Sequence, residues 1–119
     1  AAGAARARVG GVRYEVRWGT GALEGVGDSI SLPLGDLRFP LVVRGWRPGD
    51  RVRLGYGSKK LKKLFLEARV PPGERHRIPV LADAAGRVLW VPGVARAAGA
   101  QSEHDQDVLT IRITHAPPD

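Results

Sequence analysis

The chain has 119 residues, 43% of them hydrophobic, and a formal net charge of +7, which describes one globular domain with a strong positive excess. Its lack of cysteine excludes disulfides, thiolate metal sites and thiol catalysis. Because no apolar run approaches the roughly 20 residues that span a bilayer and no secretory leader is visible, we expect a cytoplasmic protein that does not bind membranes.

The N-terminal residues predict a linker followed by a strand. Residues 1–10 begin with an alanine-rich stretch. We expect them to be a linker or the tail of a preceding element, and we expect a single domain over residues 11–119. Between residues 12 and 18, apolar and charged side chains alternate, which is typical of a half-buried strand.

Two further strands are predicted in residues 29–34 and 37–43. Gly35-Asp36 lies between them and is a hairpin signal. Pro40 cannot donate a hydrogen bond to a neighbouring strand, which indicates that the second strand lies at a sheet edge or is broken there.

All four lysines of the chain lie in one pentapeptide around Leu61, whereas the other basic residues are all arginines. The apolar positions that follow have i, i+3, i+4, i+7 spacing, which predicts a helix with the lysines on its opposite face: Leu61, Leu64, Phe65 and Ala68. Ser58 is expected to be the N-cap, which would place the lysines in the first turn or so. Ammonium groups and free backbone N–H groups at one helix start would form a phosphate-binding surface.

The remaining elements are short. Residues 51–54 alternate in the manner of a strand, and residues 74–77 predict a single helical turn. Residues 78–82 and 87–91 flank a turn and predict a hairpin, and a last strand is expected over 108–114, after the acidic loop 103–107. The fold class is therefore α+β: mostly antiparallel short strands, sandwich-like, with one amphipathic basic helix.

The positive charge is concentrated in one third of the chain. Residues 44–77 contain eleven lysines and arginines against three acids, a net charge of +8, so the rest of the chain carries −1. Such a local excess is typical of a surface that binds a polyanion.

No catalytic or metal-binding constellation can be defended. The three histidines, His76, His104 and His115, do not have the spacing of metal ligands. Asp50 follows a compact Arg47-Pro-Gly turn and is interpreted as a turn-capping carboxylate.

Four short motifs carry a resemblance to a known family. They are Arg44-Gly-Trp-Arg47-Pro-Gly-Asp50, Gly57-Ser-Lys-Lys-Leu-Lys-Lys-Leu-Phe65, Pro71-Pro-Gly-Glu-Arg75-His-Arg77-Ile-Pro79 and Trp90-Val-Pro-Gly93. In this order and spacing, over residues 42–95, the chain resembles the C-terminal domain of tRNA(Ile)-lysidine synthetase. The flanks, residues 1–36 and 98–119, carry no such motif and are expected to supply strands of the same domain.

The resemblance implies a division of labour within a longer enzyme. The full enzyme joins lysine to the wobble cytidine of an isoleucine tRNA with the use of ATP, and Mg is expected there too. That chemistry belongs to an N-terminal domain with a Ser-Gly-Gly-x-Asp-Ser loop, which this chain lacks. We therefore expect a non-catalytic fragment of an ATP-dependent tRNA-modifying ligase, with no cofactor of its own, whose partners are the acceptor stem of the tRNA and the N-terminal catalytic domain.

The basic side chains of the central segment are the expected RNA-binding residues: Lys59, Lys60, Lys62, Lys63, Arg44, Arg47, Arg51, Arg53, Arg75 and Arg77. For Arg75 and Arg77, pairing with Glu74 or Asp50 is an equal alternative. Trp46 and Tyr56 are candidate stacking platforms, whereas Trp18 and Trp90 are expected in the core.

Two interpretations stay open at this stage. Leu66 projects among the lysines, where it is either an exposed residue, a contact to a neighbouring domain, or a surface that packs against a ribose. The whole domain could also be a protein-interaction or interdomain module whose basic face docks on an acidic partner.

Overall fold

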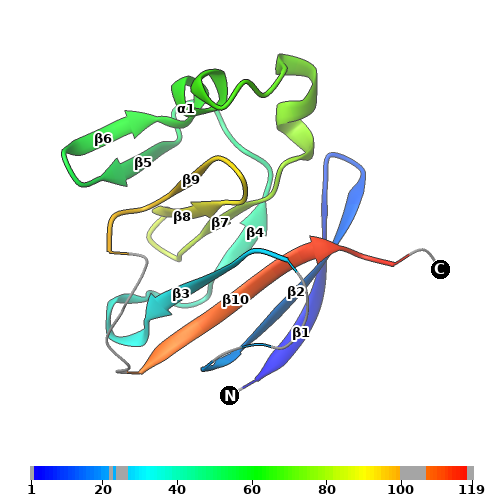
Figure 1. Cartoon of the computed structure of the whole chain (residues 1–119), viewed down its shortest axis with the longest axis vertical. Helices are drawn as coiled ribbons and strands as arrows, with labels where there is room; N and C mark the ends of the chain where they lie inside the picture. The colour runs from blue at the N-terminus through cyan, green and yellow to red at the C-terminus, as the bar shows by residue number, and fades with distance from the viewer. Residues whose placement is uncertain (1, 22, 24–26, 100–106, 118–119) are drawn as a thin grey trace.

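The computed structural model describes residues 2–21, 23, 27–99 and 107–117. Over these residues the chain forms three layers, which are seen one above another in Figure 1. Two four-stranded antiparallel sheets make the first two layers, and a two-stranded hairpin with the helices makes the third. The α+β, mostly antiparallel fold class expected from the sequence is confirmed.

The first sheet has the strand order β1-β2-β10-β3. Its strands are β1 (Gly3–Val9), β2 (Val12–Thr20), β3 (Ser29–Pro33) and β10 (Val108–His115). Val16, Ile30 and Ile111 are buried on the face of this sheet that packs against the second sheet, and the alternation of buried residues is seen in β2 and β3.

The second sheet has the order β4-β7-β8-β9 and lies between the other two layers. Its strands are β4 (Val42–Arg44), β7 (Val80–Ala82), β8 (Val88–Val91) and β9 (Ala95–Arg96). All residues of β7 and β8 are buried, because one face packs on the first sheet and the other on the third layer. Trp90, buried as expected, belongs to the first of these two cores.

The third layer holds eight of the eleven lysines and arginines of residues 44–77. It comprises β5 (Arg51–Leu54), β6 (Gly57–Lys60), the helix α1 (Leu61–Glu67) and the 3₁₀ helix η2 (Pro72–Arg77). A second 3₁₀ helix, η1 (Leu34–Asp36), follows β3. Val52, Leu61 and Phe65 are fully buried and pack against Val80 and Val91 of the second sheet. No helix among the described residues is long and apolar enough to cross a membrane.

Two expectations about the N-terminal third are wrong. Residues 3–9 form the edge strand β1 rather than a linker, because their backbone pairs with β2 over the full register from Gly3↔Trp18 to Val9↔Val12. Residues 29–34 and 37–43 do not form a hairpin. β3 pairs with β10 of the first sheet, while β4 begins only at Val42 and pairs with β7 of the second. The break at Pro40 is confirmed, since residues 37–41 form no strand.

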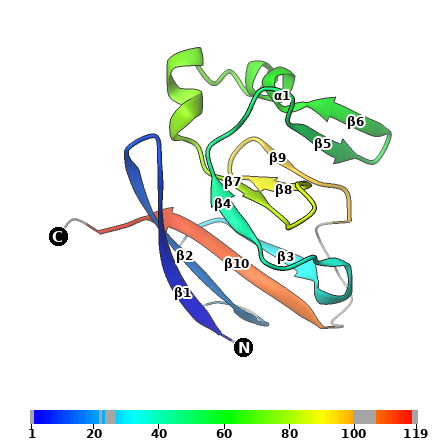
Figure 2. The same ribbon diagram turned by 180° about the vertical axis from the view of Figure 1, so that it is seen from behind.

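The turn between β1 and β2 packs against η2, and the two lie beside each other in both views (Figures 1 and 2). The Tyr14 hydroxyl on β2 donates a hydrogen bond to the carbonyl of Arg77, and burial raises the pKa of that phenol. A side chain at Gly10 would collide with the backbone carbonyl of His76. These contacts hold the basic layer at a fixed position relative to the first sheet.

Candidate nucleic-acid interface

The β5–β6 hairpin sorts its basic residues onto one face. The register pairs Arg51 with Lys60 and Arg53 with Ser58, so these four side chains share the outer face of the hairpin. Arg51 Nε donates to Ser58 Oγ at 3.2 Å. Val52 lies on the inner face and is fully buried, which confirms that it points inward between two exposed arginines.

Lys59 lies on the inner face of the same hairpin, opposite Val52, and is not on the helix. Its Nζ lies 2.7 Å from Oε2 and 3.0 Å from Oε1 of Glu67, the last residue of α1. The hydrogen bonds that Lys59 donates to the Glu67 carboxylate raise the pKa of its ammonium group. Lys59 is therefore neutralised within the domain.

The expected helix start is wrong by two residues, since the N-cap is Lys60 and not Ser58. Residues 57–60 form strand β6 because they pair with β5, and α1 begins at Leu61 with Lys60 as its N-cap. Ser58 does not cap the helix. The first helical N–H, that of Leu61, donates to the Asp50 carbonyl at 2.8 Å. Only Lys62 and Lys63 lie in the first turn, and α1 has seven residues, so a phosphate site built on its free N–H groups is not supported.

The faces of α1 otherwise follow the predicted spacing. Leu61, Leu64 and Phe65 are buried, whereas Lys62 and Lys63 are exposed. Ala68, expected on the buried face, is exposed because it is the C-cap and the chain turns away there. Leu66 is 66% exposed, as its position among the cations predicted.

Leu66 lines a shallow hollow on the third layer together with four cations. The hollow has a volume of about 240 Å³ and is lined by Lys60, Lys62, Lys63, Leu66 and Arg75. Lys60 ends β6, the two other lysines and Leu66 lie on α1, and Arg75 lies on η2. Three elements thus bring cationic side chains around one exposed apolar residue.

Arg75 is the most constrained of these cations. It is 7% exposed, its guanidinium lies 5.7 Å from the centre of the Phe65 ring, and its Nε donates to the Val70 carbonyl at 3.3 Å. No carboxylate pairs with Arg75 among the residues that the structure describes. Its neighbour Arg77 instead pairs with Glu74 at 3.6 Å, the alternative that the sequence had left open.

Arg44 is committed to a structural ion pair. Its two terminal nitrogens donate to both carboxylate oxygens of Asp50 at 2.9 and 3.0 Å, and Nη1 also donates to the Gly45 carbonyl. Asp50 accepts the Arg47 N–H at 2.8 Å, which confirms its turn-capping role. Burial opposes the ionisation of Asp50, but the hydrogen bonds and charges of Arg44 and Arg47 outweigh it and hold the pKa of the carboxyl below its usual value.

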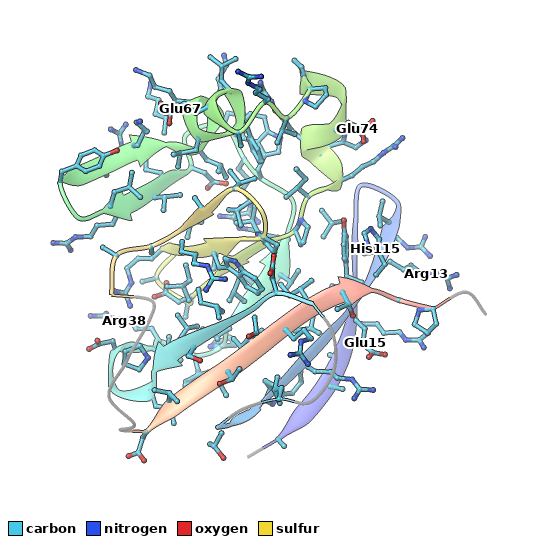
Figure 3. All side chains as sticks on the ribbon, in the orientation of Figure 1. Arg13, Glu15, Arg38, Glu67, Glu74 and His115 are labelled. Carbon is cyan, nitrogen blue, oxygen red and sulfur yellow. The ribbon has the colours of Figure 1, made fainter. Side chains whose placement is uncertain are left out.

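The pairing pattern leaves the charge excess on eight side chains. Each of the three acids in residues 44–77 pairs with one cation: Asp50 with Arg44, Glu67 with Lys59 and Glu74 with Arg77. Glu67 ends α1 and Glu74 lies in η2, both on the third layer (Figure 3). The cations of this segment that have no carboxylate partner in the described part of the chain are Arg47, Arg51, Arg53, Lys60, Lys62, Lys63, Arg69 and Arg75.

Arg69 is a basic residue that the sequence motifs did not single out. It follows the C-cap of α1 with φ = 59°, in the left-handed region. The Val70 N–H donates to the Phe65 carbonyl and the Arg69 N–H to the Leu66 carbonyl, so the helix ends in a Schellman motif with arginine where glycine is usual. The signal in the sequence was its place at the C-terminal end of the predicted helix, inside the charged segment.

The aromatic residues considered as stacking platforms differ in their exposure. Tyr56, in the turn between β5 and β6, is 79% exposed. Trp46 is half-buried and packs edge-on against Phe65, with ring centres 5.5 Å apart, so its ring belongs to the second core. Trp18 is only partly buried.

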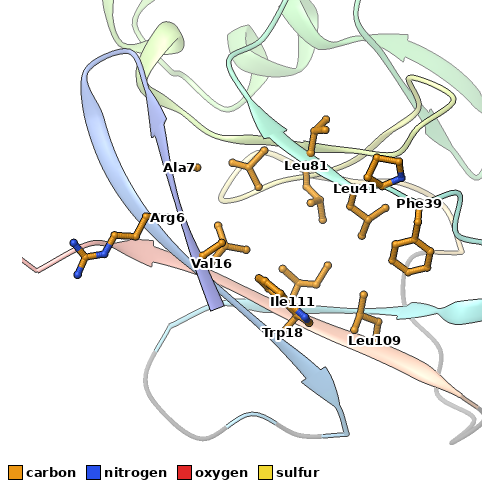
Figure 4. A pocket seen from close by; sticks show the side chains of 13 residues that line it. Arg6, Ala7, Val16, Trp18, Phe39, Leu41, Leu81, Leu109 and Ile111 are labelled. Atoms are coloured by element: carbon orange, nitrogen blue, oxygen red, sulfur yellow. The ribbon is translucent and has the colours of Figure 1, made fainter. Parts of the chain in front are cut away.

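A second, larger hollow lies elsewhere and is lined mainly by apolar side chains. A groove of about 510 Å³ opens between the first sheet and residues 39–43, and its lining is almost wholly apolar. Figure 4 shows Trp18, Phe39 and Leu109 around it, while the Arg6 side chain points away. A groove without convergent polar groups offers neither a catalytic site nor a polyanion site. No group of histidines and acids among the described residues could hold a metal ion. His104 and most of the acidic loop lie outside the described residues.

A protein-family model decides the relationship of the chain to known proteins. The model of the TilS substrate C-terminal domain matches residues 41–113. The chain belongs to this family. The resemblance predicted from the four motifs is thereby confirmed.

Relatives of this TilS C-terminal domain are considerably longer than the chain. A tRNA(Ile)-lysidine synthase of Exiguobacterium sibiricum is 47% identical over 65 residues, which cover 55% of this chain and 16% of that protein. Another from Geobacillus kaustophilus is 52% identical over 62 residues, 50% of this chain and 13% of that protein. The chain thus spans a small part of the curated relatives that it matches.

A solved structure extends the likeness to the flanks. A crystal structure of a TILS C-terminal domain superposes with a TM-score of 0.77 at 32% identity, covering 96% of this chain and 92% of that one. The strands outside the motifs, β1, β2, β3 and β10, therefore belong to the same fold as the basic layer.

Proposed function

We propose that this TilS C-terminal domain is a tRNA-binding, substrate-recognition module whose third layer docks on the acceptor stem of an isoleucine tRNA. One observation carries the proposal: internal ion pairs engage all three acids of the charged segment, so eight cations have no carboxylate partner in the described part of the chain, and all of them except Arg75 are exposed. An A-form stem presents phosphates and 2′-hydroxyls to such a surface.

We expect the lysines and the arginines to contact phosphates in different ways. Lys60, Lys62 and Lys63 are exposed and place ammonium groups on phosphates without demanding one geometry. Arg51 and Arg53, held side by side on the hairpin, are suited to two-pronged phosphate contacts. Arg44 and Lys59 are omitted from this contact set because Asp50 and Glu67 already hold them.

Full-length activity is part of the same proposal. In the longer enzyme, a catalytic N-terminal domain would use ATP, free lysine and Mg to modify the wobble cytidine in the cytoplasm, while this domain holds the far end of the tRNA. We assign these small molecules no residue in this chain.

The test is the salt dependence of tRNA binding by the chain. The logarithm of the affinity for an isoleucine tRNA, measured by fluorescence anisotropy between 50 and 300 mM salt, should fall linearly with the logarithm of the salt concentration. The variant K62A/K63A should make the slope shallower by about 1.4–1.8, since each lost phosphate contact removes roughly 0.7–0.9. The matched control R17A/R38A removes two exposed arginines outside the third layer and should leave the slope unchanged.

An unchanged affinity and slope for K62A/K63A would refute the proposal. If the chain then bound an acidic protein partner through the same lysines, and tRNA not at all, the basic face would serve protein docking instead.

A further inference from the structure

The hollow lined by Lys60, Lys62, Lys63, Leu66 and Arg75 has a size that limits its occupant. At about 240 Å³ it is smaller than the roughly 300–1,000 Å³ of sites that enclose a whole small molecule. It is also open and shallow. Such a hollow suits a small protruding part of a larger ligand rather than a free metabolite.

The chemistry of its lining narrows the occupant further. The surface of the hollow is almost wholly apolar, since Leu66 and the methylene stems of the lysines form it, while cationic groups surround it. None of its lining residues has a hydrogen-bond acceptor in its side chain. The hollow therefore cannot match the mixed donors and acceptors of a base edge, but it can hold an apolar unit that lies between anions.

Leu66 is the apolar side chain at which such an occupant would bind. It is 66% exposed on a helix whose other outward side chains near the hollow are lysines. An exposed apolar side chain among four cations has no favourable contact with water or with the charged groups around it. It gains stability when an apolar surface covers it.

Arg75 supplies a fixed charge at the same place. Its contacts with the Phe65 ring and the Val70 carbonyl hold the guanidinium in one position, whereas the three lysines are exposed and have long, flexible side chains. A fixed cation beside mobile ones orients one phosphate and lets the neighbouring phosphates adjust.

We infer that this hollow binds one sugar–phosphate unit of an RNA backbone, with Leu66 against the ribose and the surrounding cations on the phosphates that flank it. The inference rests on the proposed function and specifies what that surface contacts. It makes the contact sensitive to shape and blind to base sequence, because a ribose carries no base identity.

The test separates an apolar contact from a charged one. In L66A, the affinity should fall about 3- to 10-fold at every salt concentration, while the slope of affinity against salt stays that of the unaltered chain. Two RNA hairpins of unrelated stem sequence should show the same loss. V42A is the matched control, because Val42 is exposed at 42% on β4, outside the basic layer, and its affinity should not change.

Each other outcome has a definite meaning. If the chain binds both hairpins with a steep salt slope but L66A binds as tightly as the unaltered chain, the hollow is unused and only this inference fails. If the loss in L66A differs between the two hairpins, a base occupies the hollow and the inference is wrong. If the unaltered chain shows no salt-dependent RNA binding, the proposed function fails as well. Urea unfolding midpoints of both variants check that the fold is intact.

Discussion

Arg44 holds Asp50 through two parallel hydrogen bonds, from Nη1 to Oδ2 at 2.9 Å and from Nη2 to Oδ1 at 3.0 Å. The same carboxylate accepts the Arg47 N–H, and the Asp50 carbonyl accepts the first N–H of α1. This ion pair thus joins the end of β4 to the start of β5 and to the start of the helix. Arg44 and Asp50 therefore have a structural role: they hold β5 and α1, which carry other basic residues, in position.

Removal of the Asp50 charge should destabilise the domain. D50N leaves the half-buried Arg44 guanidinium without its counter-charge, and we expect the free energy of unfolding to fall by about 2–3 kcal/mol. Urea unfolding at pH 7 measures this loss. R17A, which removes an exposed arginine paired with Glu15 on β2, is the control and should change the stability little.

The same carboxylate predicts how stability depends on pH. Because the pKa of Asp50 is lower in the folded chain than in the unfolded one, its contribution is fully present above the unfolded value of roughly 3.9 and is lost as the pH falls through the folded value. Asp83 has the same sign: burial opposes its ionisation, but hydrogen bonds from the Arg87 N–H and side chain outweigh it and lower its pKa. The midpoint of urea unfolding should therefore decrease as the pH is lowered from 7 to 2.5. The decrease should be smaller in D50N than in the unaltered chain. Equal acid sensitivity of the two would contradict this.

Glu67 should limit the affinity for RNA. E67Q removes the partner of Lys59, which then becomes free to contact a phosphate, and it also removes a negative charge from the basic layer. We expect the affinity for tRNA to rise about 2- to 5-fold at 100 mM salt and the salt slope to steepen by up to about 0.9. E15Q makes the same charge change on β2, at the Glu15–Arg17 pair. It should give a smaller gain in tRNA affinity and leave the salt slope unchanged.

Replacing Arg69 by glycine should raise the stability of the domain but remove one charge of the proposed RNA-binding surface. Its left-handed backbone at φ = 59° costs a residue with a Cβ about 1 kcal/mol relative to glycine, so R69G should raise the free energy of unfolding by about that amount. Both R69G and R69A should make the salt slope of tRNA binding shallower by about 0.7–0.9. R69A retains the strain, so a gain in stability in R69A equal to that in R69G would show that backbone strain is not the cause.

Gly10 should be required for the first sheet to hold η2. A Cβ at Gly10 would collide with the His76 carbonyl oxygen, so G10A must push the β1–β2 turn and η2 apart and should cost about 1–3 kcal/mol. G11A is a matched control, since Gly11 also has a positive φ but a Cβ there would meet nothing within 4 Å. Thermal unfolding of the two variants compares them. A loss in G11A as large as that in G10A would attribute the effect to φ rather than to the contact.

The sequence alone predicted the features that depend on residues close to one another along the chain. The spacing of Leu61, Leu64 and Phe65 predicted the buried face of α1 because helical contacts repeat within one or two turns. Alternation predicted β2 and the inward Val52, and the order of short motifs predicted the family. The concentration of charge in residues 44–77 predicted where a polyanion surface would lie.

Only the tertiary structure decided which of those charges are available. Lys59 and Lys60 lie on a strand because β5 offers their backbone groups hydrogen bonds that a helix start would have left unmade. β1 is a strand for the same reason, since its backbone pairs with β2 across the Gly10-Gly11 turn, although the alanine-rich composition of residues 1–8 predicts no strand. Arg44, Lys59 and Arg77 are neutralised by acids up to eight residues away, and Arg75 is fixed on Phe65 from another element. Sequence counts the charges of the chain, but the packing of β6, α1 and η2 sets which of them face outward.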